Sequence, residues 1–289
     1  MSTGDTMPRS WAFFWLLAMV SPSACCAAPP VSNPGTALPS SAPHDDKRLH
    51  GGGCSIEWMA GGQADAHNLA NHATQLVGGF DTLLGAGRTK KLMGGIDCRV
   101  HLHTVASGVA RPGLATTLTA GESGRETADI FLLASGSHGA SFRSAAGLPP
   151  AWPYLEKTFL HELAGVLFAA AANEKPTGFR FYDSPAWFHQ GAEEYASIIL
   201  MSDAASRRQV GAFYADRVRK KRDRIAFAPE VHVQDVYGDG ALLVAYLVRE
   251  RTVAQLLDAS AGTLGDILKP DEWAGFDSWL ASDAPFRVK

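Results

Sequence analysis

The chain has 289 residues, of which 46% are hydrophobic and 19% are charged, so it is long and apolar enough to bury the core of one domain or of two small ones. Its formal net charge of −3 argues against a general nucleic-acid-binding protein, because such proteins carry a marked excess of basic residues.

The N-terminal segment has the pattern of a signal peptide. Arg9 precedes an apolar run at 11–20, which is too short to cross a bilayer but has the length of a signal-peptide core. We therefore expect residues 1–28 to be a signal peptide. The protein is then periplasmic or secreted and has no transmembrane span after cleavage. Cys25 and Cys26 leave a lipid-anchored form open as an alternative.

Residues 29–52 are rich in Pro, Ser, Ala and Gly and have no hydrophobic period, which predicts a flexible linker. The folded domain is expected to cover residues 53–289. It contains two cysteines, Cys54 and Cys98, which in an exported chain most simply form a disulfide. Two free, buried thiols are the alternative.

The first half of this domain mixes helical and strand patterns. Hydrophobic residues recur with helical spacing over residues 65–84, and they alternate with polar residues in the segment that begins at Ile96, which predicts a half-buried strand. His101 and His103 share the polar face of that strand. Nothing else nearby completes a metal site, so we expect exposed histidines. Two further strands are predicted at 115–119 and 129–134.

The segment 158–198 contains the candidate catalytic and metal-binding residues. A zinc peptidase of the His-Glu-x-x-His type places two imidazoles at i and i+4, because this spacing stacks them on one helix face, and the Glu acts as general base toward a metal-bound water. Here His161 and Glu162 hold the first two places, and the place of the second histidine is taken by Gly165. Ser184 is expected to cap the start of a second helix.

That second helix resembles the downstream helix of the peptidase MA-like family of gluzincin zinc metallopeptidases, whose pattern is roughly Pro-x-Trp-Leu-x-Glu-Gly-x-Ala-Glu-Tyr. The identities with this pattern are Pro185, Trp187, Gly191, Glu194 and Tyr195. The resemblance implies that the third zinc ligand is replaced by Gln190, and that Glu194 takes the position of the carboxylate that orients the first histidine.

The resemblance also implies that the site has lost its ability to hold zinc, because His161 alone keeps a ligand position and an amide is a poor substitute for a carboxylate. We therefore expect no cofactor, and Glu162 is then a vestigial general base. The alternative is a rearranged zinc site in which His189 and Glu193 join His161. Tyr237 lies where such enzymes sometimes place a hydroxyl near the cleft, although packing at a helix start also explains it.

The expected fold is α+β and zincin-like, with a small mixed sheet packed on the His-Glu helix and a helical C-terminal half. The rival is an unrelated helical domain. In the gluzincin family the last strand before the helix is a sheet edge that holds extended substrate. This predicts a peptide-binding rim at 129–134, and an ordinary edge strand is the alternative.

Two functions of different class follow. The first is an exported, non-catalytic relative of the peptidases that binds a peptide or protein in the cell envelope or serves as a structural module. The second is an active hydrolase, either with a displaced metal site or acting through Glu162 without a metal.

Overall fold

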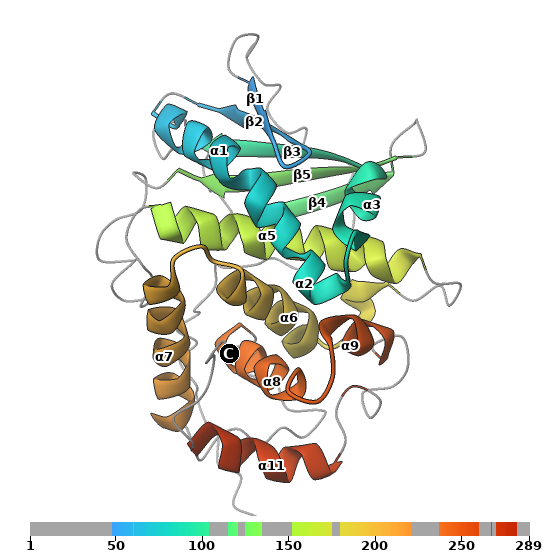
Figure 1. Ribbon diagram of the computed structural model, residues 1–289, viewed down its shortest axis with the longest axis vertical. Coiled ribbons are helices and arrows are strands. Elements are labelled where there is room, and N and C mark those ends of the chain that lie inside the picture. Colours follow the sequence, from blue (N-terminus) through green and yellow to red (C-terminus); the bar gives the residue numbers. More distant parts are fainter. Residues whose placement is uncertain are drawn as a thin grey trace, which may run out of the picture.

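The computed structural model describes residues 48–59, 61–103, 115–120, 125–134, 152–174, 180–220, 237–259, 267 and 270–281. Within these ranges the chain forms one small sheet, with both parallel and antiparallel strands, and many helices, as the α+β prediction requires (Figure 1). The expected signal peptide lies outside the described residues. Among the helices that are described, none is both long and apolar enough to cross a membrane.

The sheet has five strands in the order β1-β2-β3-β5-β4. Their bounds are β1 (Arg48–Gly51), β2 (Cys54–Trp58), β3 (Ile96–His103), β4 (Ala115–Ala120) and β5 (Glu126–Leu133). The three central strands are parallel to one another, and the two outer strands run antiparallel to their neighbours. The last strand before the helix, β5, is therefore paired on both sides. The prediction of an edge at 129–134 is wrong, because β4 folds back and takes the outer position.

The described helical elements occupy two parts of the chain, between β2 and β3 and after β5. Their bounds are α1 (Gln63–Gly79), α2 (Asp81–Leu84), α3 (Arg88–Gly94), α5 (Trp152–Asn173), the 3-10 turn η3 (Phe181–Asp183), α6 (Ala186–Ile199), α7 (Ala204–Lys220), α8 (Gly238–Leu247), α9 (Val253–Ala259) and α11 (Pro270–Ala281). Helix α5 contacts β4 and β5 on one side and α6 on the other (Figure 1). The described part of the chain beyond it is helical, as expected of the C-terminal half.

The first strand lies inside the segment that the composition predicts to be a linker. β1 pairs with β2 from Arg48↔Glu57 to Gly51↔Cys54, so the fold begins before the expected boundary at residue 53. The turn between them is Gly52 and Gly53, whose φ angles are 61° and 84°. Glycine reaches this left-handed region readily, so the run of glycines forms a tight hairpin where a flexible segment was expected. Residues 29–47 lie outside the described chain.

The disulfide between Cys54 and Cys98 forms as expected. The two cysteines are direct neighbours on the parallel strands β2 and β3, and each side chain is 1% exposed. Residues 96–103 also alternate between buried and partly exposed positions, as the sequence pattern predicts. The crosslink therefore joins the two strands from the buried face of the sheet.

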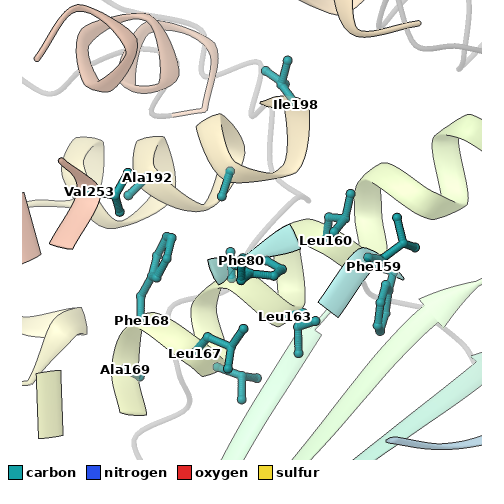
Figure 2. Packing of buried hydrophobic residues seen from close by; sticks show 14 of the residues in the cluster. Phe80, Phe159, Leu160, Leu163, Leu167, Phe168, Ala169, Ala192, Ile198 and Val253 are labelled. Carbon is teal, nitrogen blue, oxygen red and sulfur yellow. The ribbon is translucent and has the colours of Figure 1, made fainter. Parts of the chain in front are cut away.

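Helix α5 is the centre of the hydrophobic core. Its side chains Phe159, Leu163 and Leu167 are fully buried, and Figure 2 shows them in one apolar cluster with Phe80, which lies between α1 and α2, and with Ala192 and Ile198 of α6. Contacts with the sheet on one side and with helices on the other leave this helix little exposed surface. Any polar side chain on α5 is consequently held at a fixed place inside the molecule.

Helices α6 and α8 approach each other through two glycines. A Cβ atom at Gly191 would lie 2.4 Å from the carbonyl carbon of Gly240, and a Cβ at Gly240 would lie 2.4 Å from the carbonyl oxygen of Trp187. Backbone atoms cannot rotate away from such a contact. The glycine of the second motif is therefore required by helix packing, whatever the chemistry of the site.

We predict that Gly191→Ala and Gly240→Ala each lower the free energy of unfolding by about 1–3 kcal/mol, because the added methyl group overpacks the contact between α6 and α8. Gly78→Ala is the matched control, since Gly78 is helical and a Cβ there meets no atom within 4 Å. It should leave stability unchanged or raise it by up to about 1 kcal/mol. Urea unfolding of the three variants measures the effect, and equal stabilities would contradict the close contact.

We also predict that replacing both cysteines by alanine lowers the free energy of unfolding by about 4 kcal/mol, because the disulfide closes a loop with a sequence separation of 44. Denaturant unfolding with and without a reducing agent measures the loss. Reductant should destabilise the wild-type protein and leave the double variant unchanged.

Candidate functional site

The packing of α5 against α6 brings His161 and Glu194 together. Nδ1 of His161 lies 3.0 Å from Oε2 of Glu194, and both side chains are buried. A carboxylate on the neighbouring helix therefore fixes the ring of His161 from the Nδ1 side. This is the arrangement that the resemblance predicts for these two residues.

Glu194 is held in turn by two residues that the sequence analysis missed. Lys157 Nζ lies 2.5 Å from its Oε1, and the hydroxyl of Tyr214, on α7, donates a hydrogen bond of 2.5 Å to the same oxygen. Lys157 lies four residues before His161, so the two side chains share one face of α5. A lysine one helical turn before His161, in a helix whose other side chains are mostly apolar, was the available signal for such a buried ion pair.

The second nitrogen of His161 faces another carboxylate. Nε2 lies 3.3 Å from Oε2 of Glu193, which is also buried. The same Glu193 oxygen accepts a hydrogen bond of 2.8 Å from the side-chain amide of Gln190. Since Nδ1 is engaged by Glu194, Nε2 is the nitrogen that a metal would use, and a carboxylate of the chain itself now lies against it.

A side chain at position 165 would have to displace the ends of two other side chains. A Cβ there would lie 2.5 Å from the hydroxyl oxygen of Tyr182 and 2.9 Å from Oε1 of Glu193. Tyr182 is on η3 and the residue as a whole is 37% exposed, while its hydroxyl oxygen lies close to the buried position 165. Burial and the negative charges of Glu193 and Glu162 raise the pKa of Tyr182, which keeps the hydroxyl protonated.

Two carboxylates decide the charge of His161. Burial by itself lowers the pKa of His161, but hydrogen bonds and charge interactions with Glu193 and Glu194 outweigh burial and raise the pKa well above its ordinary value. Burial raises the pKa of Glu194, but the charge of Lys157 and the contact with His161 bring it well below its usual range. At neutral pH the site therefore contains an imidazolium between two carboxylates.

The remaining predicted site residues lie around this pair. Tyr237 precedes α8, and its ring centroid lies 5.7 Å from that of His161. His189 donates from Nδ1 to the carbonyl oxygen of Ser184, and burial lowers its pKa. The expected cap is wrong, because Pro185 is the N-cap of α6 and the Ser184 hydroxyl donates to the carbonyl oxygen of Phe181. Glu162 is half-buried beside His161. His189 is thus engaged by the backbone, and Glu193 is the member of the alternative ligand set that reaches His161.

The two histidines on β3 lie on the other face of the sheet from the core. Nε2 of His101 lies 2.8 Å from Oδ1 of Asp129, and the rings of His101 and His103 both stack on Phe131. The expected full exposure is wrong for both, because neighbouring strands supply a carboxylate and an aromatic ring that cover them in part.

Comparison with family models, with curated proteins and with solved structures gives no match for this chain. The resemblance to the gluzincins therefore depends on the residues of α5 and α6 themselves.

The residues at the expected zinc positions do not fit the metal. Zinc in proteins takes three or more His, Cys or carboxylate ligands. Gly165 offers no ligand, and the Gln190 amide donates to Glu193. Within the described ranges, no three His, Cys, Asp or Glu side chains are grouped as metal ligands. The chain's own groups can form a buried network of two cations and two carboxylates.

We predict that the stability of the protein falls as pH rises above about 6.5, the pKa of an unperturbed histidine. A pKa that is raised in the folded state stabilises the protein fully below the unfolded value, and this contribution is lost as pH rises toward the folded value. The loss is up to about 1.4 kcal/mol per pH unit for one group. Urea unfolding between pH 6 and 9 should show this slope in the wild type and a shallower one in His161→Gln.

The matched control for that experiment is His50→Gln, because His50 is exposed at the edge of the sheet. It should retain the wild-type slope. If the slope is the same in all three proteins, His161 is not the titrating group, and the buried imidazolium is excluded.

Proposed function

We propose that this chain is an exported, metallopeptidase-like protein that has lost zinc and proteolytic activity, and that it acts by binding a peptide or protein in the cell envelope or as a structural module. The observation that carries this proposal is the contact between Nε2 of His161 and Glu193. It puts a carboxylate of the chain on the atom through which a peptidase of this kind would hold its metal.

The loss of activity follows from the chemistry. In the zinc peptidases the glutamate beside the first histidine takes a proton from a water that the metal has acidified, and the metal polarises the scissile carbonyl. Glu162 is present here, but without the metal there is no acidified water and no polarised carbonyl on which its carboxylate could act. The residues that remain can support packing and binding, and they do not supply the reaction.

Two features support a relation to the peptidases rather than a coincidental His-Glu pair. Glu194 contacts Nδ1 of His161 from the second helix, as the motif requires. The helix that carries His161 also packs on a mixed sheet. Both are expected of a zincin-like fold, and both are unnecessary in an unrelated helical domain.

The edge strand β4 is the place that the proposal assigns to an extended peptide. Among the described residues its one partner strand is β5, and it contacts α5. Backbone groups on the free edge of a strand can pair with a peptide without any catalytic residue. A peptide-binding role is therefore compatible with the loss of the metal.

We predict that protein purified without chelators and then equilibrated with zinc contains far less than one zinc ion per chain, and that His161→Ala has the same metal content. Elemental analysis after gel filtration measures this. Hydrolysis of unstructured peptides should stay at the level of the buffer for both proteins. Stoichiometric zinc that disappears in His161→Ala would instead favour the hydrolase with a rearranged metal site.

A further inference from the structure

Three residues of the site depend on one another through direct contact. Glu193 receives its hydrogen bond from the Gln190 amide, and its other oxygen, Oε1, occupies the space beside Gly165. A carboxylate at position 190 would meet the carboxylate of Glu193 at a separation near the present 2.8 Å, with no proton between them. A histidine at position 165 would collide with it.

The charges of the buried site are balanced only when Glu193 is included. Lys157 pairs with Glu194, and His161 lies between Glu194 and Glu193. Without Glu193 the two buried cations would face one carboxylate. A buried charge without a partner is strongly destabilising, so Glu193 completes the pairing of these groups. Its Oε2 lies 3.3 Å from Nε2 of His161, which is the side of the ring that a metal ion would have to approach.

We propose that Glu193 is the residue that excludes metal from this site, and that Gln190 and Gly165 are the partners its carboxylate requires. The carboxylate takes the place of a metal ion against Nε2 of His161. This inference rests on the proposed function, because it assumes that the site derives from one that held zinc. It adds that Gly165 and Gln190, the two residues that differ from the expected zinc ligands, both accommodate the carboxylate of Glu193.

The first test measures the coupling without any metal. Gln190→Glu should lower the denaturation midpoint strongly in the wild-type background, because it opposes two carboxylates. In a Glu193→Ala background the same substitution should have a much smaller effect. Gln75→Glu is the matched control, since it adds the same charge on an exposed position of α1 and should change the midpoint little in either background. Equal effects of Gln190→Glu in both backgrounds would overturn the proposal.

The second test restores the ligands. Gly165→His and Gln190→Glu are combined in a Tyr182→Phe background, which removes the hydroxyl that meets position 165, and this protein is compared with the one that also carries Glu193→Ala. Zinc affinity is measured by competition with a chromophoric chelator. We expect Glu193→Ala to lower the dissociation constant at least 100-fold. If it leaves the affinity unchanged or weakens it, Glu193 is neutral or is itself a ligand, and the proposal fails.

The two tests separate this inference from the proposed function. Stoichiometric zinc in the wild-type protein would contradict the proposed function, whatever the denaturation midpoints of the first test show. A metal-free wild type in which Gln190 and Glu193 do not couple would leave the proposed function standing and remove the metal-excluding role of Glu193. The first test needs only single and double variants that unfold cooperatively, so it remains decisive if the triple and quadruple variants of the second test do not fold.

Discussion

A buried imidazole between two carboxylates is the constraint on which the site depends. Taking a charge out of water costs several kcal/mol unless it is paired, so His161, Glu193 and Glu194 cannot be altered one at a time without leaving a buried charge unbalanced. Lys157 and the Tyr214 hydroxyl complete the set by holding Glu194. The result is a polar network enclosed in apolar packing, in which each member fixes the orientation and protonation of the next.

The fold imposes this network because the helices that carry it cannot move independently. Helix α5 is enclosed by the sheet and by other helices, and α6 is pressed against α8 through the contact of Gly191 with Gly240. The distance between His161 and the carboxylates of α6 is therefore set by close backbone packing. Side chains of the network are positioned by the core around them, which is the condition for a site of fixed geometry.

The sequence predicted the parts of the structure that depend on local pattern. The disulfide, the alternation on β3 and the core helix follow from spacing and composition, because period and side-chain type determine them directly. The approach of Glu194 to His161 was implied by the family resemblance. The glycine hairpin before Cys54 and the outer position of β4 were missed, since both depend on which strands pair. Tyr182 and Tyr214 were missed because they reach the site from elements whose docking no local pattern specifies.

The position of Glu193 explains why the motif alone could not settle the chemistry. In the sequence, Gly165 and Gln190 are two separate losses at ligand positions, and Glu193 is a candidate only for the ligand set of a rearranged zinc site. In three dimensions the glycine leaves space for that carboxylate, and the amide donates a hydrogen bond to it. Oε1 of Gln190 and Oε1 of Glu193 are buried without a hydrogen-bond partner among the described residues, at a cost to stability. The space beside His161 is nevertheless filled by a charge of the sign that an imidazolium needs. The departures at the ligand positions are therefore better understood as one rearrangement of a buried ion network than as the decay of a catalytic motif.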